Sequence, residues 1–140
     1  MEAKELRLSL KRKWFEMTKA GIKTEDYREI TPYWITRLVD WSNYPKETAD
    51  DCKNIAENIL YDLNNGHDFE VVLSSYYSSF KPFITNTMTL GYPKSGDTER
   101  ILKLEHKGIE IREGNPEWGA EPGKKYFVIK HGKELTKKEK

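Results

Sequence analysis

The sequence contains little of what disulfides and metal sites are built from. It has one cysteine, Cys52, and three histidines in 140 residues. A single cysteine excludes an intramolecular disulfide and a metal site made of cysteines. The histidines, His67, His106 and His131, do not have the spacing of metal ligands, so we expect each to lie on the surface or to be hydrogen-bonded within the fold. We therefore expect neither a metal ion nor a cofactor.

Long apolar runs and a large charge of one sign are also missing. No stretch reaches the length of a bilayer span, and the first residues do not resemble a signal peptide, so we expect a cytoplasmic protein with no membrane partner. Lys and Arg number 24 against 23 Asp and Glu, a formal net charge of +1. This balance excludes a polybasic protein that holds nucleic acid by bulk attraction, but it is compatible with a local basic pocket.

Aromatic residues, in contrast, are plentiful. They make up 12% of the chain and include four Trp and eight Tyr. Such side chains gain free energy on burial, which indicates a folded protein and argues against disorder. The length is that of one domain. We expect this domain to cover residues 1–132 and the charged residues 133–140 to form a solvated tail.

Periodicity predicts the order of the elements. A helical face with apolar residues three and four apart is clear at residues 52–63, with Thr48 as a candidate cap, and Thr31-Pro32 marks the start of another helix. The remaining elements are a strand at 6–10, a short helix ending near Gly21, an extended segment at 23–30, and strands at 69–73, 102–111 and 126–129. Gly108 is either a bulge or a turn between two strands. Early helices and late strands predict an α+β fold with a strongly curled sheet or a small β-barrel and flanking helices.

The segment Gly21-Ile22-Lys23-Thr24-Glu25-Asp26-Tyr27-Arg28 is the densest candidate site. In a strand, Thr24, Asp26 and Arg28 share one face, while Glu25 and Tyr27 share the other. A hydroxyl, a carboxylate and a guanidinium on one face present donors and acceptors to a polar ligand, and Lys23 with Arg28 could hold a phosphate. The alternative is that Asp26 and Arg28 simply pair at the surface, for about 1 kcal/mol or less.

Other aromatic residues have two interpretations each. Trp118, in the Gly/Pro-rich segment 115–123, is either a stacking platform for a base or a hydrophobic plug beneath a loop. Tyr33, Trp34, Leu38 and Trp41 lie at helical spacing, which favours core packing. If these aromatics were exposed, the helix would instead suit a protein-interaction module.

The N-terminal segment resembles a known family. Gly21-x-Lys23-Thr24-x-Asp26-x-Arg28, preceded by Leu8-Ser9-Leu10-Lys11-Arg12-Lys13-Trp14-Phe15, is similar to the G-x-K-x-x-E-x-R signature of ASCH domains, with Asp26 in place of the glutamate. Residues 116–129 resemble the closing loop and strand of bacterial and phage members, whereas residues 73–98 match nothing in the family.

The resemblance implies a PUA-like fold and a cleft that receives RNA or a nucleoside. The family's motif residues line that cleft, which would make Lys23, Asp26 and Arg28 pocket residues, with Thr24 and Tyr27 beside them and Trp118 as the stacking candidate. We therefore expect a binding module for RNA, a nucleotide or a modified nucleoside. Its oligomeric state cannot be predicted from these features.

One branch of the family consists of amidohydrolases that remove the acyl group of N4-acetylcytidine. The resemblance places their lysine at Lys23, but their threonine nucleophile falls on Asp26, with Thr24 two residues earlier. An activated hydroxyl needs an adjacent base, and the sequence does not indicate one. Hydrolysis of acylated cytidines, with Lys23, Thr24 and Asp26 as catalytic candidates, is therefore the second hypothesis.

Overall fold

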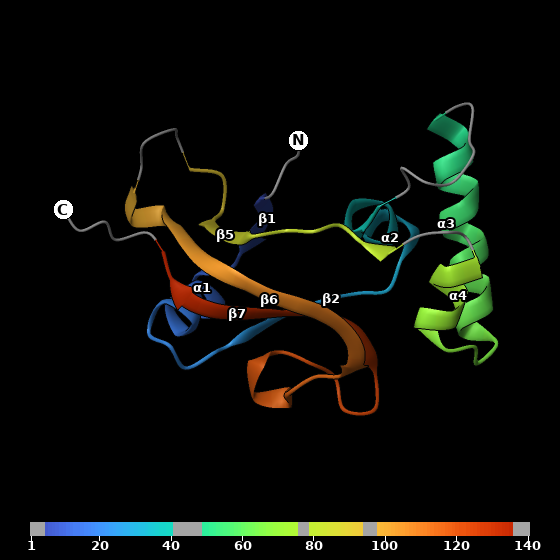
Figure 1. Cartoon of the computed structure of the whole chain (residues 1–140). Coiled ribbons are helices and arrows are strands. Elements are labelled where there is room, and N and C mark those ends of the chain that lie inside the picture. Colours follow the sequence, from blue (N-terminus) through green and yellow to red (C-terminus); the bar gives the residue numbers. More distant parts are fainter. Residues whose placement is uncertain (1–4, 41–48, 76–78, 94–97, 136–140) are drawn as a thin grey trace.

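The computed structural model describes residues 5–40, 49–75, 79–93 and 98–135, and for residues 49–53 and 98 it describes the backbone alone. Several sequence predictions fall outside this description: Trp41, the Thr48 cap, the Cys52 side chain and the end of the tail at 136–140. Figure 1 shows the chain with its elements labelled.

The centre of the fold is a five-stranded sheet that curls into a half-barrel. Its strands follow the order β1 (Glu5–Leu10), β5 (Thr85–Leu90), β6 (Ile101–Glu113), β7 (Lys125–Glu134), β2 (Glu25–Arg28). The β1–β5 pair is parallel and the other pairs are antiparallel. A separate two-stranded sheet pairs β3 (Val39–Asp40) with β4 (Ser79–Phe80). The predicted α+β fold with a strongly curled sheet and flanking helices is confirmed.

Two strands follow directly from their apolar patterns. In β1, Leu6, Leu8 and Leu10 are buried while the residues between them are exposed. In β7, Tyr126–Ile129 is a continuous buried run, so the side chains on both faces of this part of the strand are buried. Strand β7 continues through Lys133 and Glu134, where the charged tail was expected to begin.

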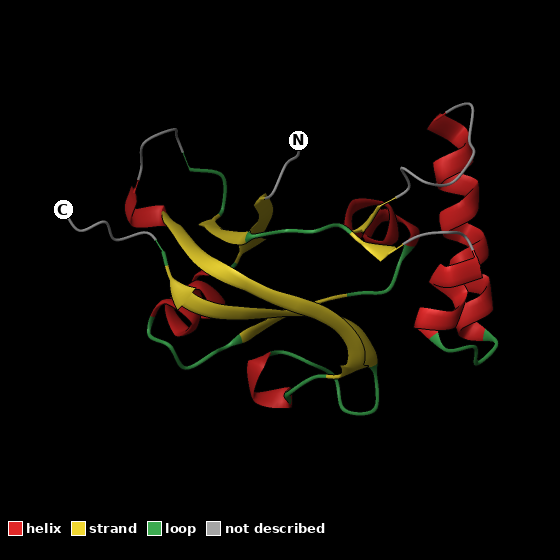
Figure 2. Ribbon diagram, viewed as in Figure 1, coloured by secondary structure: helices red, strands yellow, loops and turns green. Residues whose placement is uncertain are grey.

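Four helices surround the sheet within the described residues. They are α1 (Arg12–Lys19), α2 (Pro32–Leu38), α3 (Ala49–Asn64) and α4 (Phe69–Ser75). In Figure 2, α3 and α4 lie side by side at one end of the sheet, away from α1. Buried Ile55, Ala56 and Ile59 form the predicted apolar face of α3. No helix in the described ranges is long and apolar enough to cross a membrane.

Helix α2 begins as predicted but ends earlier than its aromatic pattern suggests. The Thr31 hydroxyl caps it by accepting a hydrogen bond from the Trp34 backbone N–H at 3.3 Å. The helix stops at Leu38, because the chain turns into β3 at Val39. Tyr33 is 61% exposed, so the prediction that it packs in the core is wrong, whereas Trp34 is half-buried against the core.

The segment at 69–73 is a helix, not the predicted strand. Phe69, Val72 and Leu73 are buried while Glu70 and Val71 are exposed, which is the three-and-four spacing of a helix face. The run was too short for its apolar content alone to separate the two structures. The Phe69 ring contacts the sheet, with its centroid 5.6 Å from that of Phe127.

Two regions that the sequence left open are strands. Residues 85–90 form β5, in the interior of the sheet, with Asn86, Thr87 and Thr89 buried. Gly108 is a bulge and not a turn, because β6 continues through it. Its φ is +118°, and the pairing of β6 with β7 shifts register at this point.

Candidate functional site

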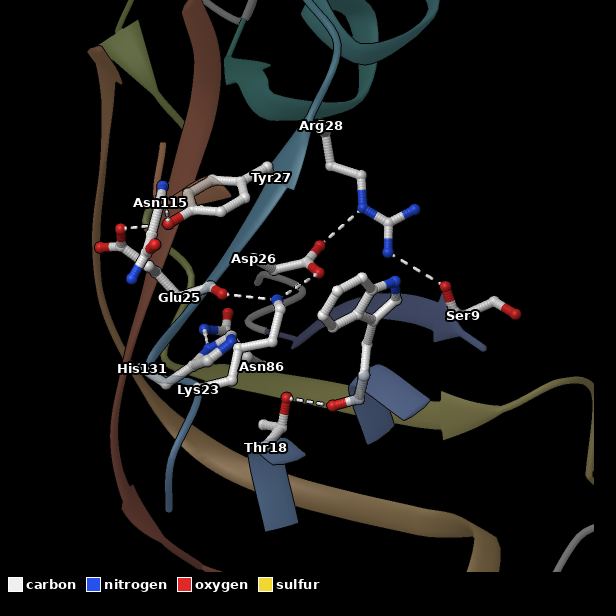
Figure 3. Close-up of polar contacts among 11 residues, drawn as sticks. Ser9, Thr18, Lys23, Glu25, Asp26, Tyr27, Arg28, Asn86, Asn115 and His131 are labelled. Carbon is white, nitrogen blue, oxygen red and sulfur yellow. Dashed lines mark hydrogen bonds and ion pairs between the residues drawn. The ribbon is translucent and has the colours of Figure 1, made fainter. Parts of the chain in front are cut away.

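The side chains of β2 divide between two faces as its alternation predicts. The Arg28 Nε donates to Asp26 Oδ2 at 2.6 Å on one face, and the Tyr27 hydroxyl donates to Glu25 Oε2 at 2.6 Å on the other. Figure 3 shows these two groups on opposite sides of the strand. Asp26 is buried, so its pair with Arg28 is not the exposed surface pair that was the alternative.

Lys23 lies beneath the Asp26–Arg28 pair and is itself 3% exposed. Its ammonium donates to the Glu25 carbonyl at 2.6 Å and lies 3.4 Å from Asp26 Oδ1. The same Nζ is 5.4 Å from the centroid of the Tyr27 ring. Burial lowers the pKa of Lys23, and the charge of Asp26 opposes that change. Asp26 is thus shared between two cations (Figure 3).

Arg28 joins three elements around this carboxylate. Its Nη2 donates to the Ser9 carbonyl of β1 at 3.0 Å. Its guanidinium carbon also lies 5.0 Å from the centroid of the Trp34 ring on α2. The planar guanidinium is therefore held by a carboxylate, a carbonyl and an aromatic ring, which fixes its orientation.

The opposite face of β2 is held by a second charged group. Arg112 of β6 donates to both carboxylate oxygens of Glu25, at 2.6 and 3.1 Å. Burial would raise the pKa of Glu25, but the hydrogen bonds from Arg112 and Tyr27 lower it overall. Burial and the bond to Glu25 raise the pKa of Tyr27 to about 12. The Asn115 N–H donates to the Tyr27 hydroxyl at 2.8 Å, which fixes the loop that carries Trp118.

A hollow of about 390 Å³ opens where β2, the ends of β1 and α1, and this loop meet. Of the predicted site residues, it brings together Lys23, Asp26, Tyr27, Arg28 and Trp118. The last of these is half-buried at the 3₁₀ turn Pro116–Trp118. Thr24 is not among the lining residues.

Thr24 is exposed and lines a different, smaller hollow of about 190 Å³, together with His131 and Lys23. The catalytic candidates therefore do not converge as a set. Lys23 and Asp26 meet in the larger of these two hollows, and the only hydroxyl candidate lies outside it.

Sequence reasoning missed several residues that line the hollow at Asp26. They include two further aromatic rings and three charged side chains: Trp14, Tyr126, Lys11, Glu29 and Glu121. Lys11, Trp14 and Glu29 lie in or beside the segments that suggested the site, but only the fold brings them together with the segment at 121–126. The described lining thus combines cations, carboxylates and aromatic rings in similar numbers.

A partly buried polar cluster also lies next to Lys23. Its histidines were expected to be at the surface or hydrogen-bonded within the fold, but their link through Asn86 was missed. The Asn86 amide of β5 joins two histidines, with Nδ2 2.8 Å from His131 Nδ1 and Oδ1 2.8 Å from His106 Nδ1. Burial lowers the pKa of both rings, that of His131 to about 4. Figure 3 places Asn86 and His131 next to Lys23.

Two other observations bear on the choice of site. No group of three or more His, Cys, Asp or Glu side chains within the described ranges could hold a metal ion. A larger hollow, about 630 Å³, lies among α3, α4 and the neighbouring ends of the sheet strands, but it contains none of the predicted site residues. The hollow at Asp26 is therefore the candidate site.

Comparisons with family models, with curated proteins and with solved structures give no match to this chain. The similarity to ASCH domains thus rests on residues 8–15, the motif at 21–28 and residues 116–129, and it remains a prediction.

Proposed function

We propose that the hollow at Asp26 binds the base of a nucleoside, a nucleotide or an RNA. The observation that carries this proposal is the convergence of Lys23, Asp26, Arg28 and Trp118 on one concavity. A base needs flat apolar walls together with donors and acceptors for its edge, and this lining offers both.

The balance of charge favours a base over a group of phosphates as the occupant. Three cations, Lys11, Lys23 and Arg28, are matched there by three carboxylates, Asp26, Glu29 and Glu121. The carboxylate of Asp26 accepts from an exocyclic amine, and the cations donate to carbonyl oxygens of the base. A polyphosphate would meet three like charges in the same space.

Binding of the four common ribonucleosides and of N4-acetylcytidine, measured by titration calorimetry, tests the proposal. Trp118→Ala removes a half-exposed aromatic wall without opening the core. We expect it to raise Kd about 5-fold to 150-fold, since stacking on an aromatic ring contributes about 1–3 kcal/mol per base. Arg28→Gln should weaken binding as well.

The matched controls are Tyr61→Ala and Arg12→Gln, an exposed aromatic and an exposed cation outside this hollow. Both should bind as the parent does. If Trp118→Ala and Arg28→Gln also keep the parent's affinity for every nucleoside, or if no nucleoside binds, the site assignment is wrong.

Hydrolysis of an acylated cytidine is the second candidate, favoured by the lowered pKa of Lys23 beside a carboxylate. In that reaction a water would attack the acyl carbon while Lys23, in its neutral form, takes one proton of that water. Lys23 would then return the proton to N4 as the C–N4 bond breaks, so that cytidine and acetic acid, which ionises to acetate, are the products. Incubation with N4-acetylcytidine and chromatography of the products tests it. If the substrate stays intact at high protein concentration, hydrolysis is refuted and binding is the only proposed function that remains.

A further inference from the structure

A second hollow adjoins the candidate site and has a different chemical character. It measures about 380 Å³ and lies among β1, α2 and the segment that follows β5. Its charged and aromatic lining residues are Arg7, Arg28, Arg37, Tyr33, Trp34 and Tyr92. Arg28 and Ser9 line both hollows, so the two sites share a wall.

The charges of this second hollow are of one sign. None of the described residues that line it is an aspartate or a glutamate. Among the described residues, Arg7 has one ion pair, with Glu5 at 3.5 Å, and its side chain is 55% exposed, so solvent screens the pair strongly. Arg37 has no carboxylate within ion-pair distance among the described residues, and its buried Nε has no hydrogen-bond partner there. An anion bound in this hollow would supply a counter-charge to both guanidinium groups.

Aromatic rings accompany these cations. The Arg37 guanidinium lies 5.4 Å from the Trp34 ring centroid and 5.7 Å from that of Tyr33. Tyr33 and Tyr92 are 61% and 94% exposed. Exposed rings beside guanidinium groups are the combination with which proteins hold unpaired bases and the phosphates between them.

We propose that the second hollow binds a backbone phosphate and the adjacent base of a single-stranded nucleic acid whose neighbouring base occupies the hollow at Asp26. This inference rests on the proposed function, because it extends the same ligand across the wall formed by Arg28. A duplex does not fit the role, since its bases are paired and stacked. The preferred ligand is then an oligonucleotide and not a free nucleoside.

Fluorescence anisotropy with labelled hexauridylate tests the inference, with Arg7→Gln and Tyr92→Ala as the variants. Both side chains are on the surface, so the fold should tolerate their loss. Each variant should weaken hexauridylate binding about fivefold or more. Arg7→Gln should also reduce the slope of log K against log salt by about 0.7, the contribution of one phosphate contact to a single strand. Arg12→Gln and Tyr61→Ala are the matched controls and should change neither quantity.

The same variants separate this inference from the function on which it rests. Arg7→Gln and Tyr92→Ala should leave nucleoside binding unchanged. Hexauridylate binding that depends on Arg7 and Tyr92, in a protein that binds no nucleoside, would support the phosphate and base site in the second hollow. The same result would refute both the proposed function and the placement of the neighbouring base in the hollow at Asp26. Comparison with oligodeoxythymidylate of equal length shows whether the bound phosphate belongs to RNA or to DNA. Specific binding of either strand supports the inference.

Three results would overturn it. The parent protein could bind hexauridylate no more tightly than uridine, or both variants could bind it as the parent does. Hexaglutamate could also displace the labelled strand as effectively as unlabelled hexauridylate. That last result would show a site for acidic peptides, in which the bases have no role.

Discussion

The orientation of the Asn86 side-chain amide determines which ring nitrogen of His131 carries the proton. Its Nδ2 donates to the Lys130 carbonyl at 3.2 Å, and a carbonyl can only accept, so the amide cannot be turned over. The same Nδ2 therefore donates to His131 Nδ1, which places the proton of the neutral ring on Nε2. A second proton on Nδ1 would face a donor. Burial lowers the pKa of His131, and the N–H donor that faces Nδ1 opposes a second proton in the same direction.

Acidification should therefore destabilise the protein before its carboxylates titrate. The pKa of His131 is about 4 in the folded chain, against an ordinary 6.5. Between these values the unfolded chain binds the proton and the folded chain does not, so the free energy of unfolding falls as pH drops from 6.5 towards 4. The slope for one such group reaches at most about 1.4 kcal/mol per pH unit. Urea unfolding between pH 7 and pH 5 measures it.

The comparison that isolates His131 uses two variants. His131→Asn keeps an acceptor for Asn86 but cannot titrate, so its slope should be shallower than that of the parent. The remaining slope comes from His106, whose pKa burial also lowers. His67→Asn changes an exposed histidine and should keep the slope of the parent. Equal slopes in all three proteins would contradict the assignment of the proton to His131.

Asp26 should be the costliest polar residue to change near the site. Its carboxylate is the shared partner of Lys23 and Arg28, and its side chain is 6% exposed. Asp26→Asn leaves a buried ammonium without its counter-charge, which costs about 3–5 kcal/mol in comparable pairs. Lys23→Met combined with Asp26→Asn removes that ammonium and should recover part of the loss. A cost below about 1 kcal/mol for Asp26→Asn, as in exposed pairs, would contradict this account.

At the scale of elements, Gly114 sets how closely the loop at 114–123 approaches β2. A Cβ at this position would lie 2.7 Å from the Tyr27 ring carbon Cζ and 2.8 Å from Ala120 Cβ. We expect Gly114→Ala to cost about 1–3 kcal/mol of unfolding free energy by overpacking. In a Tyr27→Leu background the same change should cost less, because the ring is gone. Urea unfolding of the four proteins gives this difference, and strictly additive costs would refute the contact.

Which elements the sequence could predict depended on how their residues are buried. Strand β1 and helix α3 each bury one apolar face, so periodicity identified both. Strand β5 is interior but buries Asn86, Thr87 and Thr89, whose side chains are satisfied by hydrogen bonds to His106, Glu5 and the Gly91 carbonyl. Those partners are remote in sequence or lie beyond the strand, and their bonds make polar residues compatible with the interior. Hydrophobic patterning alone could not reveal them.

Across the whole molecule, the residues around the candidate site also fall into those that the sequence could predict and those that it could not. Lys23, Asp26 and Arg28 were found because they lie close together along one turn and strand. Trp14 reaches the hollow at Asp26, and Arg37 the second hollow beside it, only after α1 and α2 pack against the curled sheet. Their own neighbours in sequence carry no sign of this, since an aromatic or an arginine on a short helix is ordinary. The local chemistry was predictable, and the concavities that surround it were not.

Phe69 connects the helices at one end of the molecule to the sheet. Phe69 of α4 stacks on Phe80, with ring centroids 5.2 Å apart, and meets Phe127 of β7 at 5.6 Å. Phe69→Ala should cost about 3–5 kcal/mol, and hydrogen exchange should accelerate more in α3 and α4 than in β7. The reason is that Phe69 of α4 contacts β7 and that α3 packs on α4, whereas β7 is also paired with β6 and β2. Val71→Ala, on the exposed side of α4, should change stability by less than about 0.5 kcal/mol. Uniform acceleration across helices and sheet in Phe69→Ala would instead mean that the two parts open only together.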